Sequence, residues 1–339
     1  MDNSYSALKF RSLSPAAPIS KTKTSRFPKL GLQKTMEKNL TNRLSLFSKK
    51  SSSKAPLSAL TASSIEKIRN SEEMAYQRNI HKPRITAQSW IVLDGKKGKL
   101  LDGKDFENQR EIASLTKIMT CYVAVEEINS RGKSFEEYAT ISKEAAAMTG
   151  TSASLQVGDE IKLWDLLHGL MLPSGNDAAI VIAEHIGRII DPLSINPIQS
   201  FTKKMNETCK ALKLNSTYFT NPHGLSNSLN ISTAKNIAIL SYSVMKVREI
   251  KKIVQTESYR CIVKNGGNDR EIVWLNTNRL LKFGFSGIKT GYTPGAGPCL
   301  CCYVEKRKTK RIIVLLNSVS MESRWSEGLG LWRWSSKYF

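Results

Sequence analysis

The chain has 339 residues, of which 40% are hydrophobic and 24% are charged. This balance is typical of a soluble globular protein with its own core, and it excludes a fibre. No apolar run reaches the roughly 18 residues that a membrane-spanning helix needs, so we predict no membrane span. With 51 Lys and Arg against 29 Asp and Glu, the formal net charge is +22.

The N-terminal part differs in composition from the rest of the chain. Residues 1–64 contain twelve Lys or Arg, two acids and fourteen serines. A segment as polar as this buries too little apolar surface to offset the entropy that it would lose on folding. We therefore predict that residues 1–80 form a basic tail that is disordered or serves targeting. Within this tail, residues 64–78 predict a short helix. A solvated extension, an organelle-targeting peptide and a contact with nucleic acid or an acidic membrane are the alternatives. No secretory signal is recognisable, and we expect a cytoplasmic or organellar location.

Strand and helix patterns follow in the remaining chain. Residues 87–93 predict a strand, and Asp94-Gly95 predicts a turn into a return strand at 99–101. Four further segments predict helices, because their apolar residues recur at helical spacing or because residues typical of helix ends bound them. They are 114–128, 163–171, 177–190 and 198–213. The middle of the chain is therefore predicted to be helical.

The C-terminal part returns to strands and closes with a helix. Three β-rich runs cover 285–292, 299–304 and 311–318, and residues 322–334 predict a helix. Two early strands and three late ones predict one sheet, interrupted in sequence by a helical insertion. The predicted fold class is thus α/β (α+β), with a five-stranded antiparallel sheet flanked by helices. In this arrangement the early helical residues lie beside the late strands.

A serine and a lysine begin the first predicted helix. Ser-x-x-Lys is a common pattern, but only Ser114 and Lys117 open a well-formed amphipathic helix. The i, i+3 spacing places both side chains on one helical face. Free N–H groups at a helix N-terminus favour an alkoxide or oxyanion, and burial would lower the pKa of the lysine. The pair is a candidate nucleophile and general base.

Two further short motifs carry polar groups that suit a catalytic cleft. Ser174-Gly175-Asn176 lies between two predicted helices, where Ser174 or Asn176 is alternatively a helix cap. Lys289-Thr290-Gly291 lies in a predicted strand. There the glycine permits close approach by a ligand, and the strand edge can pair with an extended peptide. A solvated strand face is the alternative for Lys289.

The three motifs, in this order, resemble the signature of the serine D-alanyl-D-alanine carboxypeptidases, the low-molecular-mass penicillin-binding proteins. The matching segments are 113–120 (ASLTKIMT), 174–178 (SGNDA), 221–225 (NPHGL), 276–278 (NTN) and 287–293 (GIKTGYT). The resemblance covers about residues 85–339. It implies a β-lactamase/transpeptidase-like fold and a catalytic domain over 81–339. Residues Glu111-Ile112 depart from the family pattern, which often has a proline before Ala113.

The resemblance implies a role for each matching residue. Ser114 would be the nucleophile that forms an acyl-enzyme, and Lys117 its general base. Ser174 and Asn176 would relay protons and hold the substrate amide. The substrate-binding residues would be Lys289, Thr290, Gly291, Tyr292 and Arg324. Among these, the N–H of Tyr292 would form an oxyanion hole with that of Ser114, and Arg324 would bind the terminal carboxylate.

The implied substrate is a peptide ending in D-Ala-D-Ala, and β-lactams are the implied inhibitors. We predict no metal or other cofactor, because the chain has no His-Glu-x-x-His and no obvious ligand set for zinc. No nucleic-acid partner is expected. His223 is interpreted as a structural turn residue, and Cys299, Cys301 and Cys302 as buried core residues. The alternatives are a β-lactamase-like or esterase hydrolase on the same scaffold, or a binding protein that has lost catalysis.

Overall fold

The predicted early and late strands form one sheet in the computed structural model, which describes residues 81–306 and 308–339. The predicted tail over 1–80, including the helix at 64–78, lies outside the described residues. The strands are β1 (Ser89–Asp94), β2 (Leu100–Lys104), β9 (Phe285–Gly291), β10 (Cys299–Lys306) and β11 (Thr309–Leu316). Their order is β2-β1-β11-β10-β9, and every pair is antiparallel. The fold class is confirmed, and β9 is an edge strand.

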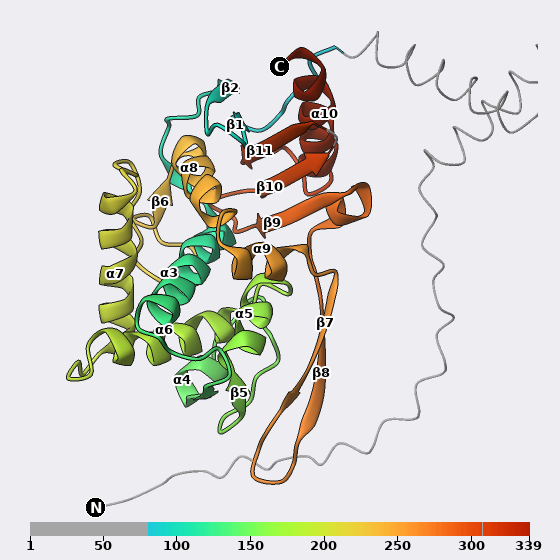
Figure 1. Cartoon of the computed structure of the whole chain (residues 1–339). Coiled ribbons are helices and arrows are strands. Elements are labelled where there is room, and N and C mark those ends of the chain that lie inside the picture. The colour runs from blue at the N-terminus through green and yellow to red at the C-terminus, as the bar shows by residue number, and fades with distance from the viewer. Residues whose placement is uncertain (1–80, 307) are drawn as a thin grey trace, which may run out of the picture. The chain divides into compact units, whose positions relative to one another are not determined.

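Both faces of this sheet are covered, which explains why its central strands are almost continuously apolar. Helix α10 (Ser323–Tyr338) covers one face, and α8 (Ala234–Val244) and α9 (Arg248–Gln255) lie against the other (Figure 1). The α10 face presents Trp90, Val92, Leu300, Cys302, Ile313 and Leu315. The opposite face presents Ile91, Leu93, Cys301, Ile312 and Val314. Burying each large side chain stabilises the fold by roughly 1.5–3 kcal/mol.

The predicted helical insertion is also present. It contains α3 (Thr116–Ser130), α4 (Lys143–Ala146), α5 (Leu163–Met171), α6 (Asn176–Ile190) and α7 (Pro197–Ala211). Helix α3 packs against α5, α6, α7 and α8, so it is enclosed on several sides (Figure 1). This central position explains how α3 can bury a charged residue such as Lys117 completely. No helix in the described part of the chain is long and apolar enough to cross a bilayer.

The structure contains small sheets that the sequence analysis did not predict. They are β3 (Arg110–Glu111) with β6 (Ile231–Ser232), β4 (Tyr138–Thr140) with β5 (Glu160–Lys162), and β7 (Ser258–Val263) with β8 (Arg270–Leu275). The β7–β8 hairpin turns through Gly266 and Gly267, both with positive φ. This glycine pair between two β-rich runs is a hairpin signal in the sequence. The predicted helix start at Ser114 was also early, because α3 begins at Thr116.

Candidate active site

Ser114 lies in a short 3₁₀ turn, η2 (Ala113–Leu115), that connects β3 to α3. The turn is closed by Leu115 N, which donates to Ile112 O at 3.1 Å. Ala113 has a φ of 48°, a region that residues with a side chain rarely adopt. The Ser114 side chain is half-buried, whereas its neighbours in the turn are buried. A strained, well-packed turn therefore presents one hydroxyl at a fixed position.

Two glycines allow other segments to pack directly against this turn. Gly224 has a φ of 84°, and a Cβ there would lie 2.1 Å from Ala113 O. A Cβ on Gly291, at the end of β9, would lie 3.1 Å from Ser114 N. The second contact confirms that the late Lys-Thr-Gly strand lies beside the early serine. It also places the N–H of Ser114 next to the end of β9.

Lys117 has three hydrogen-bonding neighbours around its amine. Nζ lies 3.1 Å from Ser114 Oγ, 2.7 Å from Asn176 Oδ1 and 2.7 Å from His223 O. The Asn176 oxygen is identified as an acceptor because Nδ2 of the same amide donates to Thr149 O at 2.7 Å. Two of the three neighbours can therefore only accept a hydrogen bond, and the third is the candidate nucleophile.

Burial and a second cation favour the neutral form of this amine, which is the form that can accept a proton. The Lys117 side chain is fully buried, and its pKa lies well below 10.5 because of desolvation and the nearby Lys289 charge. In its neutral form the amine has two N–H bonds and one lone pair. The two N–H groups satisfy Asn176 and His223, which directs the lone pair toward Ser114. The geometry thus suits removal of a proton from Ser114 Oγ.

The Ser174 loop forms the opposite side of this polar cluster. Ser174 has a φ of 72°, and its buried Oγ has no hydrogen-bond partner among the described residues. Thr151 Oγ1 donates to the Ser174 carbonyl at 2.6 Å, which fixes the loop. The alternative that Ser174 or Asn176 caps the helix is wrong: the N-cap is Gly175, without a side-chain cap bond. Asn176 cannot cap because its amide is engaged by Lys117 and Thr149.

Asp177 is a supporting residue that the motif analysis missed. Its buried carboxylate accepts from Ala153 N at 2.8 Å and from Leu155 N at 3.3 Å. It thereby ties segment 152–155 to the start of α6, next to Asn176. Its negative charge opposes the lowering of the Lys117 pKa. The sequence did contain a signal for this role, because Asp177 lies in the first turn of a predicted helix, where a carboxylate is favourable.

The second buried lysine lies on β9. Lys289 Nζ donates to the Thr290 carbonyl at 3.0 Å, and the side chain is 1% exposed. Desolvation, followed by the Arg324 charge, lowers its pKa to about 7. Thr290 Oγ1 shares a 3.0 Å hydrogen bond with Thr277 Oγ1. This hydroxyl pair comes from the Lys-Thr-Gly and Asn-Thr-Asn motifs, which the fold brings together.

Arg324 lies in the first turn of α10 and is buried. Its Nη1 donates to Gly291 O at 3.0 Å and to Cys299 O at 3.2 Å, which joins the end of β9 to the start of β10. Nε is buried without a hydrogen-bond partner among the described residues. Desolvation lowers the pKa of Arg324 to about 10. The guanidinium therefore reaches the predicted strand, but part of it is engaged by the backbone.

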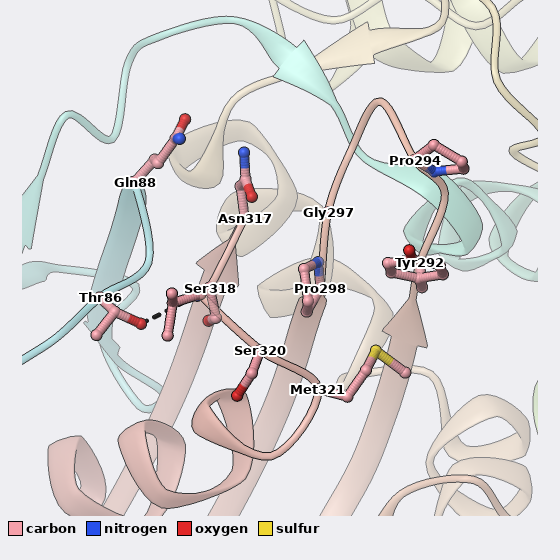
Figure 2. Close-up of a pocket in the computed structure, with 11 residues that line it drawn as sticks. Thr86, Gln88, Tyr292, Pro294, Gly297, Pro298, Asn317, Ser318, Ser320 and Met321 are labelled. Carbon is pink, nitrogen blue, oxygen red and sulfur yellow. Dashed lines mark hydrogen bonds between the residues drawn. The ribbon is translucent and has the colours of Figure 1, made fainter.

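Tyr292 follows β9 and stands at the edge of an open cavity of about 580 Å³ (Figure 2). Its side chain is 56% exposed. The cavity is lined by uncharged residues at the strand ends, namely Thr86, Gln88, Tyr292, Pro294, Gly297, Pro298, Asn317, Ser318, Val319, Ser320 and Met321. Lys289 and Thr290 are absent from this lining. The cavity therefore reaches the end of β9 only at Tyr292 and does not include the two preceding polar residues of that strand.

His223 contributes its backbone to the cluster and not its ring. Its carbonyl accepts from Lys117, while Nδ1 accepts from Leu225 N at 3.0 Å. Desolvation and the Lys117 charge lower the pKa of the imidazole to about 4. The structural interpretation of this residue fits these contacts, although the sequence did not reveal the use of its carbonyl. The core interpretation of Cys299, Cys301 and Cys302 is confirmed, since all three are free and fully buried.

The fold and motif geometry agree with a family match. A family model described as D-alanyl-D-alanine carboxypeptidase matches residues 76–320. The chain belongs to this carboxypeptidase family. The predicted family is thereby confirmed, with its five-stranded sheet and helical insertion. Within the described residues, no group of three His, Cys, Asp or Glu side chains is placed to hold a metal ion.

Individual members of the carboxypeptidase family are similar to the chain over most of its length. D-alanyl-D-alanine carboxypeptidase DacF of Bacillus subtilis is 32% identical over 70% of this chain and 59% of the relative. The D-alanyl-D-alanine carboxypeptidase of Streptomyces sp. strain K15 is 32% identical over 73% of this chain and 86% of the relative. The chain thus spans about three fifths of the first relative's length.

Solved structures of the family show the same architecture. The Streptomyces K15 DD-transpeptidase has a TM-score of 0.71 and 31% identity, covering 76% of this chain and 99% of that one. The D-alanyl-D-alanine carboxypeptidase DacD from Francisella tularensis has a TM-score of 0.67 and 27% identity, covering 76% and 71%. The carboxypeptidase-family fold therefore extends across the described catalytic region.

Proposed function

We propose that the protein is a serine-type D-Ala-D-Ala carboxypeptidase, which removes the terminal D-alanine from peptidoglycan-type peptides through an acyl-enzyme on Ser114. The observation that carries this proposal is the environment of Lys117. A fully buried amine with a lowered pKa has two acceptors for its N–H groups and the Ser114 hydroxyl beside its lone pair. Positioned proton acceptors of this kind are what a serine nucleophile requires.

Acylation then proceeds in balanced steps. Ser114 Oγ attacks the carbonyl carbon of the penultimate D-alanine, and its proton moves to Lys117 Nζ. The N–H groups of Ser114 and Tyr292 stabilise the negative oxygen of the tetrahedral intermediate. The bond to the terminal D-alanine breaks, and Lys117 returns the proton to the leaving amine, with Ser174 as relay. Water subsequently attacks the ester, which releases the shortened peptide and regenerates Ser114.

In this proposal the free carboxylate is recognised by the sheet wall of the site, which consists of the end of β9 and the neighbouring Arg324. Lys289 supplies a positive charge, and Thr290 supplies a hydroxyl that already lies near Thr277. Arg324 contributes the Nη2 side of its guanidinium, because Nη1 is bound to two backbone carbonyls. Gly291 keeps the strand close to the nucleophile turn. Asn176 holds the substrate amide and Lys117 at the same time.

A second outcome for the acyl-enzyme is transfer to an amine in place of water. The Streptomyces K15 relative is named both a carboxypeptidase and a DD-transpeptidase. Because acylation is common to both reactions, the same Ser114 chemistry serves either one. A β-lactam would acylate Ser114 by the same attack, with ring opening in place of leaving-group release. An esterase or β-lactamase requires the same nucleophile but no recognition of a terminal D-alanine. A binding protein without catalysis requires neither the nucleophile nor the base.

The test uses Ser114→Ala in the full chain. The unsubstituted protein should gain the mass of a labelled penicillin and release D-alanine from a peptide ending in D-Ala-D-Ala. Ser114→Ala should abolish both. Ser130→Ala is the matched control, because Ser130 belongs to another Ser-x-x-Lys pattern at the end of α3. Labelling that survives in Ser114→Ala, or labelling without D-alanine release in the unsubstituted protein, would contradict the proposed function.

A further inference from the structure

Another cavity, of about 400 Å³, lies at the end of the sheet away from the candidate active site. It is lined by the β1–β2 turn, the connection between α8 and α9, and strands β10 and β11, through Gly95, Lys96, Tyr242, Met245, Lys246, Lys251, Tyr303, Lys310 and Ile312. Strand β10 begins at Cys299, which pairs with Gly291 at the active-site end. At the other end Glu305 pairs with Lys310 of the cavity lining. The stretch from Cys299 to Glu305 spans about 20 Å, so the two sites are distinct.

The floor of this cavity is the sheet face that α8 and α9 cover (Figure 1). Tyr303 and Ile312 are directly paired across β10 and β11, and both are buried. Side chains two positions apart on a strand share a face, so Glu305 follows Tyr303 on this face. Lys310, which pairs with Glu305, lies there too. The floor is therefore apolar toward the middle of the sheet and charged toward its end.

Glu305 anchors two of the lysines that line the cavity. Its Oε1 lies 2.6 Å from Lys310 Nζ, and its Oε2 accepts from Lys251 Nζ at 3.1 Å. The hydrogen bond from Lys310, with further ones from Lys251 and Tyr303, lowers the pKa of Glu305 to about 2, so the carboxylate is ionised. An ammonium group has three N–H donors, so each lysine retains donors for a ligand. The acid thus positions two cations and cancels one of their charges.

Two further lysines line the cavity without a countercharge. Lys96 and Lys246 form no ion pair with another described residue, in contrast to Lys251 and Lys310. Tyr242 contacts both segments: its hydroxyl donates to Lys96 O at 3.1 Å, and Lys246 Nζ lies 3.9 Å from the centre of its ring. None of the described lining residues is an acid. Four lysine charges beside the single charge of Glu305 leave the cavity strongly positive.

We propose that this cavity binds a small ligand through a phosphate or pyrophosphate group. A carboxylate brings one negative charge and two oxygens, whereas a phosphate monoester brings about two charges and three acceptor oxygens. Lysines that converge from the β1–β2 turn, the α8–α9 connection and β11 match such a compact, multiply charged anion. The volume is that of a small-molecule site, and the uncharged part of the ligand lies against Met245 and Ile312. The site is independent of the proposed carboxypeptidase function.

The test measures the binding of inorganic pyrophosphate to the full chain by isothermal titration calorimetry at constant ionic strength. We expect saturable binding to the unsubstituted protein. Replacing two cavity lysines together, Lys96→Gln with Lys246→Gln, should raise Kd about 10- to 30-fold, because two charged donors are lost. The matched control, Lys97→Gln with Lys99→Gln, removes the same charge from exposed residues outside the lining, and Kd should change less than about 2-fold. All variants share the basic residues 1–64, so the comparison isolates the cavity.

Two further measurements separate a phosphate site from general attraction. Lys246→Arg keeps the charge and should keep Kd within about 3-fold, and both lysine pairs should unfold at the temperature of the unsubstituted protein, since these residues are exposed. Absence of saturable binding, or equal weakening by the two pairs, would overturn the proposal. Displacement of pyrophosphate by acetate at the same ionic strength would overturn the phosphate class. Tighter binding of single-stranded DNA, with the same dependence on Lys96 and Lys246, would assign the surface to nucleic acid instead.

Discussion

The candidate site has a helical wall, formed by α3, and a sheet wall, formed by β9. Each wall buries one lysine, Lys117 or Lys289, but the surroundings of the two amines differ. On the helical wall, Lys117 Nζ lies within hydrogen-bond distance of three oxygens from different segments of the chain. On the sheet wall, Lys289 Nζ donates to the carbonyl of its own neighbour, Thr290. The pKa of Lys117 is well below 10.5, and that of Lys289 is about 7. One amine is thus enclosed by acceptors, and the other faces a cation, Arg324.

This difference indicates two functions for the same side-chain type. An amine whose N–H groups are already satisfied offers its lone pair, which suits a base. An amine that titrates near neutral pH beside a guanidinium binds an anion best, because an incoming carboxylate relieves the repulsion between the cations. The following substitutions test this contrast between the walls.

The largest effect should come from Lys117→Ala on the helical wall. Among the described residues, it removes the only side chain that is hydrogen-bonded to Ser114 Oγ. We expect the rate of acylation by labelled penicillin to fall by ~10²–10⁴-fold, the usual contribution of a positioned base. The mass of the intact protein in samples quenched at successive times gives this rate. Lys133→Ala is the control from another Ser-x-x-Lys pattern, and a loss of less than ~10-fold in Lys117→Ala would mean that another group removes the proton.

A smaller effect is expected from Arg324→Ala on the sheet wall. It should weaken turnover of peptides with a free terminal carboxylate by roughly 2–3 kcal/mol in transition-state terms, the scale of a lost charged hydrogen bond. Substrates with a neutral ester or a capped amide should lose much less. The kcat/KM values for both substrate types provide the comparison. Equal losses would show that Arg324 acts only by joining Gly291 to Cys299.

The Lys289 environment predicts a pH-dependent stability. Its pKa is about 7 in the fold and near 10.4 in an unfolded chain, so the unfolded state binds more protons between these values. The free energy of unfolding should therefore rise with pH through this window and be lost as pH falls toward 7. From pH 7 to 9, the unsubstituted protein should gain ~2 kcal/mol relative to Lys289→Met.

Urea unfolding at the two pH values measures this gain. Lys282→Met, which removes an exposed lysine of η3 (Arg279–Phe283), is the matched control and should keep the full pH dependence. The same pH dependence in Lys289→Met and in the unsubstituted protein would show that Lys289 keeps its ordinary pKa in the fold.

The smallest effect should come from His223→Ala. The carbonyl that accepts from Lys117 belongs to the backbone and remains, whereas the ring loses its bond with Leu225 N. We expect a stability loss of about 1 kcal/mol and a change in acylation rate of less than ~5-fold. Thermal unfolding and penicillin labelling check both values. A rate loss comparable to that of Lys117→Ala would assign the base to the imidazole and not to the helical wall's lysine.

The sequence could predict those site residues whose partners are close in the chain or belong to a recognisable motif. The i, i+3 spacing of Ser114 and Lys117 is such a case, and the structure places them 3.1 Å apart. The His223 carbonyl could not be predicted, because every residue has one and only the fold decides which carbonyl faces an amine. The cap interpretation of Asn176 failed for the same reason, since a distant lysine competes for its amide.

The sequence by itself determined the five strands of the main sheet, the long helices of the insertion and the closing helix, the family, and the chemical types present at the candidate site. Apolar runs and local spacing encode these features, because they depend on a residue and its near neighbours. Tertiary structure decided the rest. It placed Gly291 against Ser114, set Arg324 on the ends of β9 and β10, and buried Lys117 and Lys289 so that their pKa values fell. Close packing and desolvation arise only when distant segments meet, so no local pattern contains them.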